Sequence, residues 1–298
     1  MSATGGTPLD AIFIEDPSDP RLTPYLNQKD AWLRAPHNPL RQGPPLPPSG
    51  LFIAEGDLVV EQLLRSSLSV ESILTTDRHA HRVHPLLHLR ASPPTLLTVP
   101  QPLMDDIAGF HVHRGVLAAG IRPDPPDLST LLHDASLVVL LVDLANHDNV
   151  GGIFRAVAAL AGPAAAVLLT PASCDPLYRK AIRVSMGHVL RTPWAWAKPT
   201  PEETLDMLAR AGFVRLALAT GGSSLANFNP QPGTRLALIV GPEGPGLDDR
   251  WLAGVDHRLR IPMAPGVDSL NVTVATAIAL HTLASPELPA PGNVPKPL

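Results

Sequence analysis

The sequence predicts an α/β protein built from two domains. Short apolar runs of strand length alternate with segments in which apolar residues recur at helical spacing, a pattern typical of strands joined by helices. Aromatic residues make up 4% of the chain and hydrophobic residues 45%, so we expect a core of aliphatic helices and buried strands. The length of 298 residues favours a small domain followed by a medium one.

The first part of the chain is expected to form a small α/β module. Its expected elements are strands at 51–54 and 70–75 and a helix at 57–65, and further segments at 95–99, 102–107 and 115–119 repeat the alternation of strand and helix. Apolar residues on one side of the 57–65 segment support the helix. The residues of this module do not by themselves indicate any chemistry.

The second part shows the alternation more sharply. Its expected strands are residues 137–142, 167–170, 214–219, 236–240 and 259–261, and its expected helices are residues 150–161, 177–186, 202–211 and 270–283. Short buried strands joined by helical crossovers predict an open, mostly parallel sheet covered on both faces. In such a sheet a ligand binds beyond the carboxyl ends of the strands.

Proline clusters mark the expected domain boundaries, because proline interrupts helices and central strands. The cluster at 123–126 is the best linker, which gives an amino-terminal domain over 1–123 and a second domain over 127–284. The tail over 285–298 has few apolar residues to offset the entropy of ordering, so we expect it to be disordered.

Composition also limits the function classes. A net charge of −4 argues against a protein that coats nucleic acid through bulk positive charge. The single cysteine, Cys174, excludes an internal disulfide and a cysteine-based metal site. No apolar run approaches the roughly 20 residues of a membrane span, and the acidic start of the chain is unlike a targeting segment. We therefore expect a cytoplasmic protein without a membrane segment.

The first candidate motif runs from Asn149 to Arg155. Gly151 and Gly152 permit a close approach at the start of a helix, where free N–H groups and the helix dipole favour an anion. Arg155, one helical turn further on, can reach the same anion-binding position. The alternative is an ordinary helix start with a surface arginine.

The second candidate motif is the loop Gly-Pro-Glu-Gly-Pro-Gly that begins at Gly241, directly after an expected buried strand. Proline makes such a loop rigid and glycine leaves its backbone bare, so a flat ligand can lie against it. The loop matches neither the dinucleotide fingerprint nor the phosphate-loop pattern. The alternative is a tight turn in which Glu243 is a solvated charge.

The third candidate motif is Ile-Pro-Met from Ile261, followed by Ser-Leu-Asn-Val from Ser269. Ser269 is a suitable cap for a helix that begins near Leu270. Asn271 in the first turn has an amide that can hold a substrate or orient a neighbour. The alternative for Asn271 is a solvated side chain.

These three motifs, in this order and at this spacing, resemble the signature motifs of the SpoU (TrmH) family of RNA methyltransferases, within the SPOUT superfamily. The segment 183–188 is also similar to the family's usual one. Segments 54–56 and 113–118 resemble the L30e-like substrate-binding domain that many members carry, and 19–25 suggests that the amino-terminal stretch belongs to it too. The chain departs from many members at Asn146-His147, where Asp-Pro is common, and at Pro242.

The resemblance implies a carboxyl-terminal domain with a deep trefoil knot, S-adenosylmethionine as cofactor, RNA as substrate and a homodimer. It implies methyl transfer to a ribose 2'-hydroxyl in rRNA or tRNA, without a metal. The implied cofactor-binding residues are Thr220, Gly221, Gly241, Ile261 and Leu270. The implied catalytic group is Arg155, which activates the 2'-hydroxyl or binds the adjacent phosphate, with Asn149, Ser269, Asn271 and, as a brace for the loop or a partner of Arg155, Glu243.

Several alternatives stay open. A protein that binds RNA or the ribosome but has lost catalysis would keep the same fold, and an rRNA methyltransferase that confers antibiotic resistance would keep the same site. The nucleotide that is methylated is left open by the sequence. Arg78, Arg82, Arg90, Arg114 and Arg122 are expected to form a local basic face for RNA.

Two further clusters have competing interpretations. His79, His81, His84 and His88 suggest a metal site, but with only Asp77 nearby a solvated loop is favoured. Trp194 and Trp196 are suited to stacking on bases, and equally to strand packing or a dimer contact.

Overall fold

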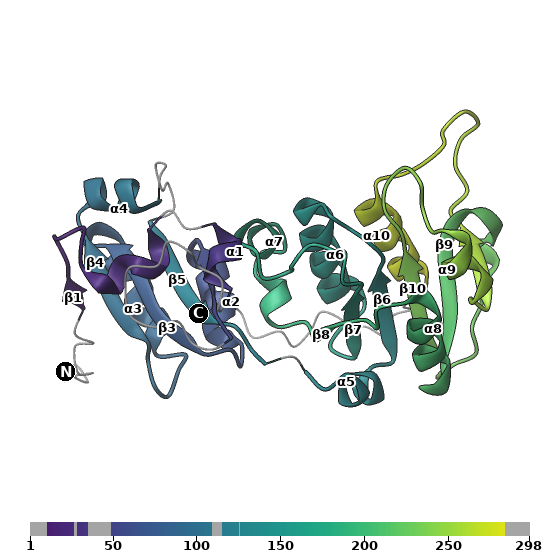
Figure 1. Cartoon of the computed structure of the whole chain (residues 1–298), viewed down its shortest axis with the longest axis horizontal. Coiled ribbons are helices and arrows are strands. Elements are labelled where there is room, and N and C mark those ends of the chain that lie inside the picture. Colours follow the sequence, from purple (N-terminus) through teal and green to yellow (C-terminus); the bar gives the residue numbers. More distant parts are fainter. Residues whose placement is uncertain (1–10, 27–28, 35–48, 109–114, 125, 284–298) are drawn as a thin grey trace, which may run out of the picture. The chain divides into compact units, whose positions relative to one another are not determined.

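The computed structural model of the chain describes residues 11–26, 29–34, 49–108, 115–124 and 126–283 (Figure 1). It divides into two compact units, each described here by itself. The first comprises the chain up to 128 together with 145–155 and 174–195, and the second comprises 129–144, 156–173 and the chain from 196. The units are not continuous pieces of chain, and the boundary at 123–126 stays a prediction. The tail 285–298 lies outside the described residues.

The first unit is built on a five-stranded mixed sheet in the order β1-β4-β3-β5-β2. Its strands are β1 (Ile12–Phe13), β2 (Leu51–Glu55), β3 (Val70–Thr76), β4 (Thr95–Val99) and β5 (Val116–Ile121). The neighbours β1, β4 and β3 are parallel, whereas β5 runs antiparallel to both β3 and β2. Its helices are α1 (Asp30–Leu33), α2 (Asp57–Arg65), α3 (Asp77–Leu87), α4 (Gln101–Ala108) and α7 (Arg179–Val184), with 3-10 helices η1 (Pro20–Tyr25) and η2 (His188–Leu190).

The strands and the helix expected in this unit are present, and they form because their apolar residues are buried. All five residues of β2 are buried, and α2 buries Val59, Val60, Leu63 and Leu64 after a turn at Gly56 with φ of 95°. Tyr25, from the amino-terminal stretch, is fully buried, and its hydroxyl donates to the Ser72 carbonyl at 2.9 Å. Residues 11–26 therefore contribute to this core.

The second unit is built on a six-stranded sheet in the order β11-β9-β10-β6-β7-β8. Its strands are β6 (Leu137–Leu141), β7 (Ala165–Leu169), β8 (Trp194–Trp196), β9 (Phe213–Ser224), β10 (Arg235–Val240) and β11 (His257–Arg260). Its helices are α5 (Leu128–Asp134), α8 (Pro201–Arg210), α9 (Asp249–Ala253) and α10 (Val272–Leu283), with 3-10 helix η3 (Leu225–Asn227), and α6 (His147–Leu160) contributes its last residues. The strand pairs from β11 to β7 are all parallel, so the predicted α/β class with a parallel sheet is confirmed.

Strand β9 is interrupted where it passes β11. Leu216 and Ala217 pair with the start of β11, and pairing resumes only at Ser223, which lies opposite Leu259. Residues 218–222 therefore form a wide bulge with no partners in β11. Gly222 closes the bulge with φ of 122°, and the Arg260 side chain donates to its carbonyl at 3.2 Å. The bulge lies at the carboxyl edge of the sheet, where a ligand site is expected.

One expectation about surface groups is wrong, and another is narrowed. The histidines at 79–88 do not lie in a loop, because residues 77–87 form α3 and His88 caps its end. Two of the arginines expected on a basic face have structural roles: Arg90 donates to three carbonyls, of Leu63, Leu64 and Leu68. The Arg122 side chain, 10% exposed, lies 3.0 Å from Asp175, and Arg114 lies outside the described residues.

The described ranges lack a metal cluster and a membrane-spanning helix. No three His, Cys, Asp or Glu side chains in them are grouped so that they could hold a metal ion. In the same residues, no helix combines the length and the apolar character that crossing a membrane requires.

Candidate functional site

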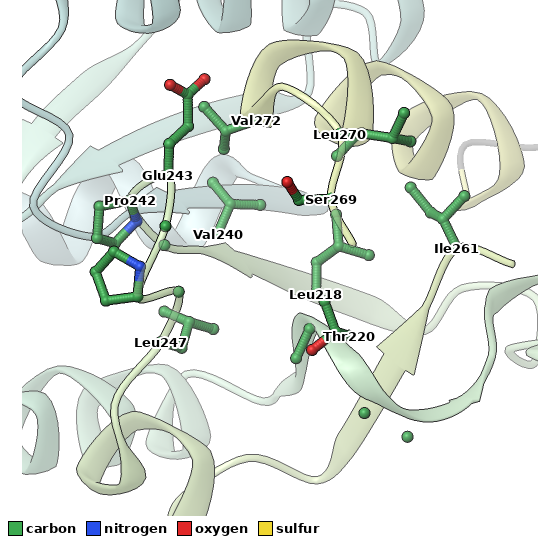
Figure 2. A pocket seen from close by; sticks show the side chains of 18 of the residues that line it. Leu218, Thr220, Val240, Pro242, Glu243, Leu247, Ile261, Ser269, Leu270 and Val272 are labelled. Atoms are coloured by element: carbon green, nitrogen blue, oxygen red, sulfur yellow. The ribbon is translucent and has the colours of Figure 1, made fainter. Parts of the chain in front are cut away.

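The second unit has a pocket at the carboxyl ends of β9, β10 and β11 (Figure 2). It encloses about 530 Å³, which lies within the range of roughly 300–1,000 Å³ typical of small-molecule sites. Its walls come mainly from the β9 bulge at 218–222, the loop at 240–247 and the segment from 261 to 275. The second and third candidate motifs therefore meet the β9 bulge at one place.

The pocket combines apolar side chains with bare backbone. Leu218, Val240, Leu247 and Ile261 line it, and the loop between β10 and α9 adds three glycines (Figure 2). Such a lining suits a ligand with flat apolar parts and polar edges, because the apolar side chains cover its faces and the backbone supplies donors and acceptors.

Gly241 allows the loop to fold back on itself. A side-chain carbon at this position would lie 2.8 Å from both the Gly246 carbonyl carbon and the Leu247 nitrogen. The Gly246 N–H donates to the Pro242 carbonyl at 3.2 Å, and Gly244 and Gly246 have φ of 90° and 68°. Residues with side chains rarely adopt those values, so the glycines fix the shape of this pocket wall.

Asn271 joins this loop to α10. Its Nδ2 donates to Glu243 Oε1 at 2.6 Å, while its Oδ1 accepts from the Thr273 N–H at 2.9 Å and the Val274 N–H at 3.3 Å. Asn271 is therefore the cap of α10. The expectation that Ser269 caps this helix is wrong, since the helix begins at Val272, and Ser269 lines the pocket instead.

Most of the predicted site residues are brought together. The pocket lining includes Thr220, Gly221, Gly241, Glu243, Ile261, Ser269 and Leu270. Asn271 contacts the pocket wall through its hydrogen bond to Glu243. Sequence reasoning missed Leu218, Leu247 and Met263, whose apolar character at strand and loop ends was the available signal. It also missed Arg258, a cation in the lining whose guanidinium donates to the Leu252 carbonyl at 3.0 Å.

Asp143 stands at the same edge of the sheet, directly after β6. The preceding Val142 N–H donates to the Val240 carbonyl at 2.9 Å, so Asp143 is one strand away from Gly241. Asp143 has φ of 51°, an uncommon value for a residue with a side chain. The Thr170 hydroxyl accepts from its N–H at 2.8 Å and donates to its carboxylate at 2.7 Å, which holds this conformation.

The other two predicted residues, Asn149 and Arg155, belong to the first unit on α6. Asn149 is buried and Arg155 is exposed. A side-chain carbon at Gly151 would lie 2.6 Å from the Ala181 carbonyl oxygen and 2.9 Å from Val184 Cβ. Gly151 is thus needed for close packing of α6 on α7, a role that the anion interpretation had not included. The place of Asn149 and Arg155 in the site stays a prediction.

Known proteins resemble this chain over most of its length. The SpoU rRNA Methylase family matches residues 136–281, from the start of β6 to the last turn of α10. Two relatives, from Mycobacterium bovis and Mycobacterium tuberculosis, are named uncharacterized tRNA/rRNA methyltransferases. Each is 37% identical over 280 residues, which cover 92% of this chain and 91% of the relative.

Solved structures share the fold. An AdoMet-bound rRNA methyltransferase from Sinorhizobium meliloti superposes with a TM-score of 0.70 at 21% identity, over 91% of this chain and 97% of its own. The SpoU methyltransferase AviRb from Streptomyces viridochromogenes, in complex with AdoMet, gives 0.68 at 23% identity, over 85% and 94%. With a relative 37% identical along almost its whole length, the chain belongs to the SpoU rRNA methylase family.

Proposed function

We propose that this protein transfers a methyl group from S-adenosylmethionine to a ribose 2'-hydroxyl of rRNA or tRNA. The observation that carries the proposal is the pocket itself, which gathers residues of the second and third motifs from separate strand ends. Family membership and relatives named tRNA/rRNA methyltransferases support the reaction class. The 2'-hydroxyl as acceptor rests on the motifs alone.

The pocket residues fit S-adenosylmethionine. Leu218, Leu247 and Ile261 offer apolar contacts for its adenine, and the backbone of 218–222 and 241–246 offers hydrogen bonds to its polar edges. Two proteins of the same fold were solved with AdoMet bound. When bound, this donor supplies a methyl group on a positively charged sulfur, which a ribose oxygen can attack without a metal.

The chain's own residues then orient the acceptor. Ser269 lies in the pocket lining, and Asn271 holds Glu243 in place from the cap position of α10. Asn149 and Arg155 are proposed to meet the ribose and its phosphate. Holding the attacking oxygen in line with the methyl group accounts for much of the barrier reduction in such a displacement.

We also propose a homodimer. Leu270, just before α10, and Val274 and Ile278 on α10 recur every four residues and are 37%, 48% and 38% exposed. An apolar stripe on a helix is costly to leave in water, so a second copy is the natural cover for it.

The test of the proposed function has two measurements. Calorimetry of the full chain should show binding of S-adenosylmethionine, and incubation with rRNA and tRNA should give one new 2'-O-methyl nucleotide by mass spectrometry. Arg155→Ala should bind the donor normally and methylate at least about 10²-fold more slowly, because it removes a group that acts at the reacting oxygen. A methyl group found on a base would contradict the proposed acceptor, and wild-type rates for Arg155→Ala would contradict the role of Arg155.

A further inference from the structure

Strand β11 of the second unit carries two exposed arginines beside the pocket. β11 is the outermost strand of the six-stranded sheet. Arg258 and Arg260 are two residues apart, so they lie on one face of the strand, while Leu259 between them is fully buried. At the usual rise of a strand their Cα atoms are roughly 6–7 Å apart.

Both arginines are attached to the pocket wall. Arg258 is part of the lining, and its guanidinium donates to the Leu252 carbonyl at 3.0 Å. The Arg260 Nε donates at 3.2 Å to the carbonyl of Gly222, which also lines the pocket. One backbone hydrogen bond thus orients each guanidinium, and a guanidinium has five N–H groups in all. Several donors on each arginine therefore stay available for a ligand.

The charges of these two arginines are not neutralised. The described part of the second unit contains six arginines. Three of them form ion pairs at 2.6–2.7 Å: Arg210 with Asp206, Arg215 with Asp256, and Arg250 with Glu202. Arg235 donates to backbone carbonyls and lies 4.2 Å from the centre of the Phe213 ring. Among the residues that the structure describes, no acidic side chain pairs with Arg258 or Arg260.

This arrangement suits phosphate groups. The planar guanidinium donates two parallel hydrogen bonds to phosphate oxygens, and two guanidinium groups in a row match a chain of successive phosphates. RNA that accepts a methyl group must come close to the pocket that holds the donor, so its backbone passes near the pocket rim. The structural alternative is that charges on an edge strand prevent pairing with another sheet.

We propose that Arg258 and Arg260 bind phosphates of the substrate RNA beside the pocket, with the identity of this partner resting on the proposed function. Contacts to phosphate fix the position of a nucleic acid without reading its sequence. The pair would therefore hold the RNA strand at the pocket whatever nucleotide is methylated. It gives the second unit an RNA contact of its own, whereas the sequence had indicated a basic face only in the amino-terminal domain.

The test measures binding of fluorescently labelled single-stranded RNA of mixed sequence to the full chain, by anisotropy at increasing salt. Arg258→Gln and Arg260→Gln each keep an N–H group for the backbone carbonyl but lose the charge. Each should weaken binding about tenfold and lower the slope of log K against log salt by about 0.7. Arg260→Lys keeps the charge and should keep the slope. Arg260→Gln should bind S-adenosylmethionine like the wild type in calorimetry, because Arg260 is not in the pocket lining.

Arg210→Gln is the matched control. It removes the same charge from an exposed arginine that is paired with Asp206 and precedes β9, at the edge of the sheet opposite the pocket. It should leave RNA binding and its salt slope unchanged.

Four results would overturn the inference. Equal weakening by Arg210→Gln would mean that only net charge matters, and an unchanged slope in both pair variants would mean that the pair meets no phosphate. Loss of S-adenosylmethionine binding in Arg260→Gln, with normal RNA binding, would assign the pair to the donor. Aggregation of the variants with normal RNA binding would assign it to protection of the edge strand. A wild type that binds RNA through the pair but methylates none would contradict the proposed function and leave this inference standing.

Discussion

Asn271 shows how one side chain can serve two structures. Its oxygen caps α10 and its nitrogen holds Glu243, so the start of the helix and the loop after β10 are fixed to each other. The side chain is exposed, yet both of its polar atoms are engaged. The position of Glu243 therefore depends on a residue whose other contacts are purely structural.

Two substitutions at Asn271 separate these roles. Asn271→Ala removes the cap and should lower the free energy of unfolding by about 1 kcal/mol, measured in urea. Asn271→Asp keeps an oxygen for the cap but places a carboxylate against Glu243, so it should retain stability and lose methylation. Equal methylation by Asn271→Asp and the wild type would show that the contact with Glu243 is not needed. Ser269→Ala, which alters no cap, serves as the control for stability.

At the scale of elements, the strands were predictable and several helices were not. Apolar runs such as 137–142 and 236–240 become buried strands because both faces of the sheet are covered. Helix α3 was missed because only Val83 and Leu87 among its residues are buried, and histidines and Pro85 dominate the rest. The β9 bulge could not be predicted, since the apolar run ends at Ala219 while pairing resumes at Ser223.

The candidate site was predictable for a different reason. Glycines, prolines and polar residues at strand ends have no role in a buried strand, so Gly241 and Ser269 could be singled out locally. The capping role of Asn271 could not be predicted. Ser269 and Asn271 are both suitable caps, and only the residue at which α10 begins distinguishes them. Likewise, nothing in the sequence says that Gly151 contacts the Ala181 carbonyl.

Helix α10 carries the prediction about assembly. Val274→Asp places a charge in the middle of its apolar stripe, so the protein should elute as a monomer in size-exclusion chromatography with light scattering, while the wild type elutes as a dimer. Leu58→Asp on α2 is the matched control, because Leu58 is 58% exposed and should tolerate the same change without altering the mass. A dimer that survives Val274→Asp would mean that another surface holds the two copies.

At the scale of the molecule, ion pairs join distant parts of the chain within the first unit. Arg122, after β5, lies 3.0 Å from Asp175, and the two side chains are 10% and 3% exposed. Arg34 approaches the same carboxylate at 3.5 Å. Segment 174–195 therefore depends on residues from before the expected linker, and removing the amino-terminal part would leave Asp175 without these two cations.

Arg122→Met tests this dependence. It leaves the buried Asp175 carboxylate without its closer cation and should lower the free energy of unfolding by about 3 kcal/mol. The double variant Arg122→Met with Asp175→Asn should recover most of the loss, because the neutral amide still accepts from the Leu177 N–H, as Asp175 Oδ1 does at 2.9 Å. Urea unfolding of the wild type, the two single variants and the double variant measures the coupling energy between Arg122 and Asp175. Losses of unfolding free energy that simply add in the double variant would refute the coupling.

The bulge at 218–222 has a consequence for how this protein can change. Pairing between β9 and β11 is fixed separately before and after it, at Ala217 and at Ser223. Residues can therefore be added to or removed from the bulge without shifting the register of either strand. One wall of the pocket can therefore be lengthened, shortened or changed in sequence while the sheet stays intact. Residues 218–222 are thus the best place for substitutions that let the pocket accept a donor with a group larger than methyl.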